Sequence, residues 1–219
     1  MKRPSLPLAA VLLAATLAAV PVATPLRAQD ASPSPSTANP AATVQDIRVT
    51  LHTSKGDIEG TLYAKHSPVA VANYLQLAGK KFYDGLKFHR VIPNFMIQGG
   101  DPEGTGGGGP GYTIDDEANK DLHFDKPGVF AMANRGANTS GSQFFITHGK
   151  TPWLEDNTGN GHYTIFGQVT KGQDVVDRIT QGDRIDSIDV HDSTQALFSA
   201  QAKLLDEWNT KMAKAKEKK

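Results

Sequence analysis

Hydrophobic and polar residues alternate one by one along the first stretch of the chain that has a regular pattern. Ile47, Val49 and Leu51 alternate with polar residues, and a second alternating run extends from Ile58 to Leu62. A period of two residues is typical of a β-strand with one buried face. The residues Ser-Lys-Gly-Asp between the two runs favour a tight turn. We therefore predict two antiparallel strands.

Two segments have the spacing of amphipathic helices instead. Ser67-Pro68 supplies an N-cap and a proline at the first helical position, and apolar residues then recur at helical spacing up to Gly79. A second, shorter helix is predicted over residues 173–180, with Gly182 just after it. The chain is therefore expected to contain at least two helices next to its strands.

Short apolar segments with a two-residue period recur through the rest of the domain. They cover residues 88–97, 129–133, 143–147, 164–169 and 184–190. Turns rich in Gly, Asn and Pro separate them, and a Pro-Asn turn divides the first of them. Many short strands with two helices predict a mainly β domain, and we expect the strands to close into a barrel.

The start of the chain has the three parts of a secretory signal peptide. Residues 1–28 contain Lys2-Arg3, an apolar run over residues 6–22, and Leu-Arg-Ala at the end. The run is short and interrupted by proline, whereas a membrane span needs about 20 apolar residues. We expect cleavage after Ala28 and export to the periplasm or the exterior, without stable membrane association. An uncleaved anchor is the alternative.

The composition changes again on both sides of the predicted domain, which we place at residues 46–192. Residues 29–45 are rich in Ala, Ser, Pro and Thr and bury too little apolar surface to offset their ordering entropy, so we expect a disordered linker. Residues 193–219 are predicted to form an amphipathic helix with a basic tail, packed on the barrel or on a partner. Its apolar face consists of Leu197, Leu204, Leu205, Trp208 and Met212.

Composition and charge restrict the class of function. The chain of 219 residues is 38% hydrophobic and 21% charged, as in a soluble globular protein. The predicted signal holds only basic charges, so the rest has 20 basic against 23 acidic residues, a net charge of −3. This balance argues against nucleic acid as a partner. The absence of cysteine excludes disulfides, thiolate metal ligands and thiol nucleophiles.

Several patterns match a functional motif by letter but lack its context. Residues 104–109 fit a dinucleotide-binding fingerprint, yet Pro110 and a strand-like segment follow where a helix is required, so we interpret them as a flexible surface loop. The acidic triplet at residues 115–117 has no histidine at ligand spacing and is interpreted as a solvated turn. Ser142 lacks the glycine that follows the serine of a nucleophile elbow. We therefore predict no metal, no cofactor and no hydrolase triad.

One arginine lies in an otherwise apolar stretch. Arg90 has apolar residues after it, including Phe95 and Met96, so a permanently charged guanidinium lies beside side chains typical of a core. A charge in such surroundings needs a partner or a function. Residues 130–147 form a second stretch that is rich in aromatic and amide side chains. On composition alone, these aromatic side chains could simply belong to the core.

These two stretches resemble the signature of the cyclophilins, a family of peptidyl-prolyl cis-trans isomerases. The matching residues are Phe-His-Arg-Val-Ile-Pro-Asn-Phe-Met-Ile-Gln-Gly-Gly-Asp at 88–101, Met-Ala-Asn at 132–134, and Asn-Thr-Ser-Gly-Ser-Gln-Phe-Phe-Ile-Thr at 138–147. The resemblance extends in order, without large gaps, from about residue 46 to residue 192. Together with the signal-like start, it indicates a bacterial exported type of cyclophilin.

The resemblance implies an eight-stranded antiparallel β-barrel with a helix at each end, and peptidyl-prolyl isomerase activity without a cofactor. It also implies that Arg90 is the catalytic electrophile. The implied proline pocket consists of Phe95, Met96, Phe145 and Leu154. The other implied substrate-binding residues are Gln98, Gln143, Ala133 and Asn134, with Trp153 and His162 at the pocket edge. Residues 155–161 place His162 farther from the Trp-Leu pair than in other members of the family.

The expected substrates are unfolded or flexible polypeptides that contain proline. We expect a monomer that assists protein folding outside the cytoplasm. The alternative is a non-catalytic proline-peptide-binding or chaperone module that uses the same groove, although a pure binder would not need Arg90. Arg135 adds a charge beside the groove, and with the compact loop at residues 104–111 it is expected to alter the preference for the residue before proline.

Overall fold

The computed structural model describes residues 43–155 and 162–217. The predicted signal peptide and nearly all of the predicted linker lie outside the described residues. Within the described residues the chain forms one antiparallel sheet of eight strands, which differ in length. The strands are β1 (Ile47–Thr53), β2 (Gly56–Leu62), β3 (Arg90–Ile92), β4 (Met96–Gly99), β5 (Val129–Met132), β6 (Phe144–Thr147), β7 (Ile165–Lys171) and β8 (Ile185–Val190). The mainly β, eight-stranded prediction is confirmed.

Four α-helices accompany the sheet in the described part of the chain. They are α1 (Pro68–Gly79), α2 (Gln173–Arg178), α3 (Gln195–Ala200) and α4 (Ala202–Lys216), and a short 3-10 helix, η1, covers Pro152–Leu154. The predicted C-terminal helix is thus two helices, because Gln201 has φ −104° and ψ 15° and interrupts the helical backbone. None of the described helices is long and apolar enough to cross a membrane.

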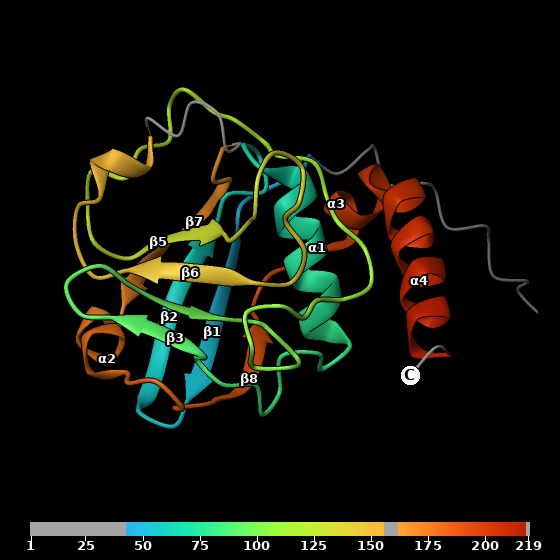
Figure 1. Ribbon diagram of the computed structural model, residues 1–219. Coiled ribbons are helices and arrows are strands. Elements are labelled where there is room, and N and C mark those ends of the chain that lie inside the picture. The colour runs from blue at the N-terminus through green and yellow to red at the C-terminus, as the bar shows by residue number, and fades with distance from the viewer. Residues whose placement is uncertain (1–42, 156–161, 218–219) are drawn as a thin grey trace, which may run out of the picture. The chain divides into compact units, whose positions relative to one another are not determined.

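The sheet curls into a half-barrel instead of the closed barrel that we expected (Figure 1). The strand order is β3-β4-β6-β5-β7-β2-β1-β8, so β3 and β8 are its two ends. No ladder joins these two strands in the described residues. The irregular segment before β3 contacts the start of β8 instead: Phe88 N donates to Asp183 O at 2.8 Å, and Gly85 N donates to Ile185 O at 2.7 Å. Lys87 and Arg184 form only an isolated antiparallel bridge there, and β3 itself is three residues long.

Alternate residues of the central strands face two different hydrophobic clusters. In β5, Phe130 belongs to the main core under α1, whereas Ala131 belongs to a second, smaller cluster. In β6, Phe144 likewise faces the main core and Phe145 faces the second cluster. Successive side chains of a strand point to opposite faces, so both faces of these strands are buried. The second cluster also contains Met96 and forms the floor of the site described below.

The start of α1 is capped differently from the sequence prediction. The hydroxyl of Ser67 donates to Ile165 O at 2.6 Å and makes no cap hydrogen bond. The carboxylate of Glu117 instead accepts from the backbone N–H groups of Val69 at 3.0 Å and Ala70 at 2.8 Å. A negative charge at a helix N-terminus satisfies free N–H groups and interacts favourably with the helix dipole. The interpretation of residues 115–117 as only a solvated turn is therefore wrong for Glu117.

The C-terminal helices pack on the domain itself. Leu197 of α3 and both Trp208 and Met212 of α4 are buried members of the main core. The indole of Trp208 stacks on the Tyr112 ring with centroids 5.5 Å apart and an interplanar angle of 4°. Figure 1 shows α4 beside α1, on the side away from the strands. This packing brings α4 next to the loop that contains Tyr112.

Candidate active site

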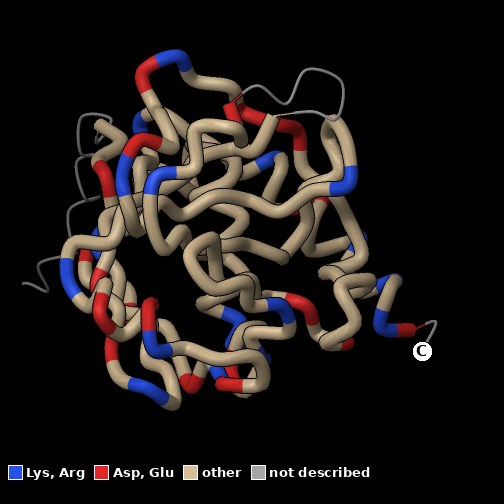
Figure 2. The backbone as a smooth tube through the Cα atoms, turned by 60° about the vertical axis from the view of Figure 1, so that its left-hand side comes forward, with Lys and Arg blue, Asp and Glu red and all other residues tan. Residues whose placement is uncertain are grey.

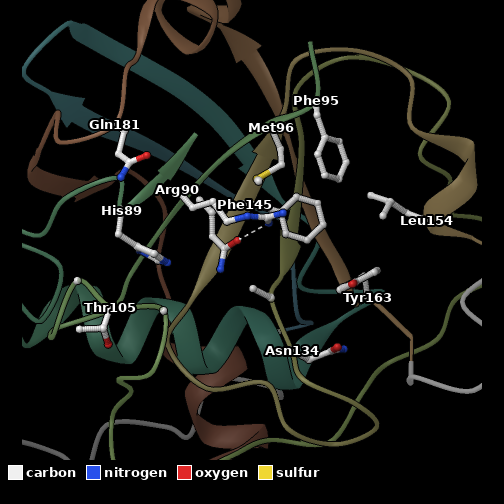
Figure 3. A pocket seen from close by; sticks show the side chains of 14 residues that line it. His89, Arg90, Phe95, Met96, Thr105, Asn134, Phe145, Leu154, Tyr163 and Gln181 are labelled. Atoms are coloured by element: carbon white, nitrogen blue, oxygen red, sulfur yellow. Dashed lines mark hydrogen bonds between the residues drawn. The ribbon is translucent and has the colours of Figure 1, made fainter. Parts of the chain in front are cut away.

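A cavity of about 680 Å³ opens on the outer face of β3, β4 and β6. Most of the residues that the resemblance implied lie around it, as Figure 3 shows. These residues are Arg90, Phe95, Met96, Gln98, Ala133, Asn134, Phe145 and Leu154. They come from the strands β3, β4 and β6, from two loops and from η1, which together span residues 90–154. We call this cavity the proline pocket, after the role that the family resemblance implies for it.

The pairing of the strands aligns the charged and aromatic side chains of the pocket. Arg90 lies opposite Gln98 in the β3–β4 ladder, and Gln98 lies opposite Phe145 in the β4–β6 ladder. Directly paired residues of adjacent strands project from the same face of a sheet. The three side chains therefore form one row across the sheet, and the Arg90 side chain projects towards the Phe145 ring (Figure 3).

The apolar part of the pocket is held by packing behind it. Met96 is 1% exposed and Phe145 is 5% exposed, so each presents only a small surface to the cavity. The Phe145 ring stacks on Phe124 at 6.1 Å and meets the Tyr163 ring edge to face at 5.6 Å. Aromatic pairs in these geometries stabilise each other beyond their buried area. The pocket is therefore formed before any ligand binds.

A chain of hydrogen bonds fixes the guanidinium of Arg90. Arg90 Nη1 donates to Gln98 Oε1 at 3.1 Å, and Gln98 Nε2 donates to Gln143 Oε1 at 3.0 Å. Gln143 Nε2 in turn donates to the carbonyls of Gly106 at 3.0 Å and Gly108 at 2.9 Å. In the part of the chain that the structure describes, no carboxylate forms an ion pair with Arg90. Its remaining N–H donors are thus available to a ligand.

The glycine-rich loop is not the unconstrained surface loop that we expected, because the carboxylate of Asp101 holds it. Asp101 accepts from the backbone N–H groups of Glu103 at 2.8 Å, Thr105 at 3.0 Å and Gly106 at 2.5 Å. Burial alone would raise the pKa of Asp101, but these backbone donors outweigh it, and the pKa lies below its ordinary value. Through Thr105 and Gly106, the loop forms one wall of the proline pocket.

Gly100 allows β4 and the segment before β6 to approach closely. Its φ is +85°, which favours glycine, and a Cβ there would overlap the carbonyl oxygen of Ser142. The Ser142 hydroxyl donates to Gly100 O at 2.6 Å and is fully buried. The Ser142 side chain therefore helps to hold β4 against the segment before β6.

Three predicted site residues lie outside the proline pocket. Gln143 lines a neighbouring groove and is connected to the pocket wall by its hydrogen bonds with Gln98 and Gly106. Trp153 is 58% exposed and packs against Phe95, with ring centroids 5.8 Å apart. His162 lines a separate cavity beside Glu155, and its carbonyl accepts from Asn134 Nδ2 at 2.9 Å. Tyr163, the residue after His162, lines the pocket wall.

The sequence prediction also missed His89, Thr105 and Gln181, which line the pocket. Both ring nitrogens of His89 are buried, and among the described residues neither makes a hydrogen bond of normal distance and angle. Burial lowers the pKa of His89, the Asp101 charge and the nearby Gln143 side chain oppose this, and the charge of Arg90 acts in the same direction as burial. In the sequence, only its position next to Arg90 suggested that His89 lies at the site. Adjacent residues of a strand normally face opposite sides of the sheet, so this position argued against it. Nothing in the pattern around Gln181 distinguishes it from a surface turn.

The comparison with known families agrees with this geometry. The model of the family described as cyclophilin type peptidyl-prolyl cis-trans isomerase/CLD matches residues 48–196. The chain therefore belongs to the cyclophilin-type peptidyl-prolyl cis-trans isomerases, a family of enzymes. The match ends before α4 begins at Ala202.

Individual proteins that are similar to this chain are also named peptidyl-prolyl cis-trans isomerases. The peptidyl-prolyl cis-trans isomerase A of Mycobacterium tuberculosis is 52% identical over 149 residues, which cover 60% of this chain and 79% of that protein. The peptidyl-prolyl cis-trans isomerase-like 1 of Mus musculus is 48% identical over 143 residues, with 64% and 83% covered. A crystal structure of a Cryptosporidium parvum cyclophilin-type isomerase in the presence of the dipeptide Ala-Pro has a TM-score of 0.59 and 34% identity. It matches 67% of this chain and 99% of that chain.

We predict that Asp101→Asn loosens the glycine-rich loop. The amide would place an N–H₂ group against the backbone donors, so the free energy of unfolding should fall by about 1–3 kcal/mol at pH 7. Because the folded pKa lies below 3.8, the contribution of the carboxylate is present above pH 3.8 and is lost as the pH falls through the folded pKa.

Urea unfolding of the wild-type and variant proteins over a descending pH series measures this difference. The difference should shrink on acidification, and Asp115→Asn, at an exposed position, is the matched control. Equal stabilities at pH 7, or a difference that grows in acid, would contradict the role of Asp101.

Proposed function

We propose that this enzyme accelerates rotation about Xaa-Pro peptide bonds in unfolded or flexible polypeptides, with Arg90 as its catalytic residue. The observation that carries the proposal is a fixed guanidinium at the rim of a preformed apolar pocket. Membership of the isomerase family supports the activity. The relative crystallised in the presence of Ala-Pro supports a proline-containing ligand.

The reaction requires a lower rotational barrier and breaks no bond. Resonance in the peptide bond gives a barrier of about 18–20 kcal/mol. Before proline the two isomers differ by only about 0.5–1 kcal/mol, yet they exchange over tens to hundreds of seconds. A catalyst therefore has to bind the twisted bond more tightly than either planar isomer.

The position of Arg90 fits this requirement. In the twisted transition state the prolyl nitrogen loses its conjugation and becomes a hydrogen-bond acceptor. A guanidinium that is already fixed by Gln98 can donate to this nitrogen without reorganisation, and it gains little from the planar ground states. Arginine needs no change of protonation for this role, because it stays charged at any working pH.

The apolar side chains contribute by holding the proline ring. We assign the ring to the surface formed by Phe95, Met96, Phe145 and Leu154, which line the pocket next to Arg90. A fixed ring lets the preceding part of the peptide turn about the bond. The ring also displaces water, and a lower local dielectric strengthens the contact with the guanidinium.

Polar groups beside the pocket would bind the peptide backbone. We assign this role to Gln98, Gln143 and the backbone of Ala133 and Asn134. The N–H of Ala133 already donates to Gln143 O at 3.0 Å, which leaves its carbonyl as the group that a peptide can use. Trp153 and His162 are proposed as contacts at the edge, where longer substrates would extend beyond the pocket.

A guanidinium and an apolar pocket can together lower the rotational barrier by several kcal/mol. A decrease in the barrier of about 7 kcal/mol accelerates a reaction about 10⁵-fold. One preorganised donor typically contributes about 10²–10³-fold, so the guanidinium would supply about half of this decrease and the pocket the rest.

We predict that Arg90→Ala and Arg90→Lys both lower kcat/KM for a proline tetrapeptide by about 10²–10³-fold with the fold intact. Lysine keeps the charge but presents no planar fork to bond Gln98 and the substrate together. A protease-coupled or exchange-NMR assay measures the rate, and circular dichroism checks the fold.

Arg178→Ala, on the exposed face of α2, serves as the control and should keep wild-type activity. Full activity in Arg90→Ala would contradict the assignment of Arg90. Peptide binding by the wild-type protein without any acceleration would instead favour a non-catalytic binding or chaperone module.

We also propose that the enzyme assists protein folding outside the cytoplasm, as a bacterial exported cyclophilin. The support is the three-part pattern of residues 1–28, which lie outside the described residues.

We expect the chain, produced in a bacterial host, to accumulate in the periplasm or medium as a form that begins at Gln29. Cell fractionation and intact-mass spectrometry measure this, and a chain that lacks residues 6–22 is the control. A full-length chain that stays with the cytoplasm or the membrane would contradict the proposal.

A further inference from the structure

A second groove continues directly from the proline pocket. It has a volume of about 810 Å³ and shares Gln98, Gly106, Ala133 and Asn134 with that pocket. A polypeptide whose proline occupies the pocket therefore has a continuous surface along which one flank of its chain can extend. We call this second cavity the flank groove.

The far wall of the flank groove is the helix α4. Lys211, Met212, Ala215 and Lys216 line it, and residues four apart on a helix share one face. The family model ends at residue 196, so this wall belongs to the part of the chain beyond the family match. The groove is thus assembled from the domain that the family model matches on one side and from the chain beyond that match on the other.

The helix is held firmly in this position. Its Trp208 stacks on Tyr112, and the Tyr112 hydroxyl donates to Asn73 Oδ1 at 2.7 Å. The backbone of the glycine-rich loop also approaches α4 closely, because a Cβ at Gly111 would lie 2.5 Å from Cβ of Ala215. The two lysines on this face are therefore presented to the groove by a fixed support.

The charges that line the flank groove are mostly positive. Arg135, Lys211 and Lys216 line it together with one carboxylate, that of Glu103. Arg135 Nη2 donates to Gly106 O, at the point where the groove meets the proline pocket. Lys211 and Lys216 are exposed, and Figure 2 shows basic positions along the last turns of the chain before its C-terminus. The side chains of the groove thus have a net charge of +2, and an acidic peptide segment complements it.

We propose that α4 makes the enzyme selective for polypeptides that carry an acidic residue on one flank of the proline, with Lys211 and Lys216 as specificity-determining residues. This inference rests on the proposed function, because it takes the proline pocket as the place where the substrate proline binds. The flank groove adjoins the pocket at the lining residues that the two share, so an acidic residue is preferred on the flank that enters the groove and not on the other flank.

The test uses the full chain and three matched peptides with one central proline. One peptide has only neutral flanks, one has glutamate before the proline, and one has glutamate after it. The readout is the ratio of kcat/KM for each acidic peptide to kcat/KM for the neutral peptide. Exposed ion pairs have modest strength, so one of the two ratios should be about three to ten in the wild-type enzyme at low salt. The ratio should approach one at about 1 M salt, where the Debye length is about 3 Å.

The double variant Lys211→Gln/Lys216→Gln should lower this ratio to below about two. The double variant Lys203→Gln/Lys214→Gln removes the same total charge from α4 at exposed positions that do not line the groove, and it should keep the wild-type ratio. Ratios near one for both acidic peptides in the wild-type enzyme would overturn the proposal. So would a preference that survives in the groove variant, or one that the control pair loses equally.

This outcome is separable from a failure of the proposed function. If the wild-type enzyme does not turn over the neutral peptide, the isomerase proposal fails. The binding of the same three peptides, measured by fluorescence or NMR titration, then still tests the groove. Tighter binding of one acidic peptide that disappears only in Lys211→Gln/Lys216→Gln supports the role of α4, and equal binding of all three peptides contradicts it.

Discussion

The hydrogen-bond chain from Arg90 through Gln98 and Gln143 to the glycine-rich loop is the interaction on which the site depends. It crosses two strand pairings, so the register of β3 on β4 and of β4 on β6 has to be correct before the chain can form. It ends on the carbonyls of Gly106 and Gly108, whose loop is held from the other side by Asp101. One polar network thus connects the Arg90 guanidinium, the amides of Gln98 and Gln143 and the glycine-rich loop.

The network works because the other wall is apolar and already packed. Phe145 and Met96 are buried against a second hydrophobic cluster that lies on the opposite face of the strands from the main core. This arrangement explains why a charged guanidinium lies in an apolar stretch of sequence. Arg90 is not a buried charge that lacks a partner, because its neighbours in sequence alternate between the two clusters while its own side chain extends over an open pocket.

Much of the fold could be predicted from local patterns, because alternation and capping residues act over a few positions. The strands around Val49, Ile58 and Phe145 are examples. The errors concern contacts between residues distant in sequence. Ser67 looks like a cap, but Glu117 provides it. The glycine-rich loop looks unconstrained, but Asp101 holds it. Tyr163 lines the pocket wall although no sequence pattern singled it out. The amphipathic pattern of the C-terminal extension could be recognised in the sequence. Its place beside the flank groove could not, because it depends on the packing of Trp208 on Tyr112.

The central claim is that the positive charge of Arg90 stabilises the twisted peptide bond more than the planar one. The most direct test replaces Arg90 with citrulline, which keeps the planar shape of the side chain and part of its set of N–H donors but has no charge. Exchange NMR at saturating peptide then measures the cis-trans rate on the enzyme separately from peptide affinity. The account predicts a rate about a hundredfold lower with a dissociation constant within about threefold of wild type. A rate close to that of the wild-type enzyme would contradict it.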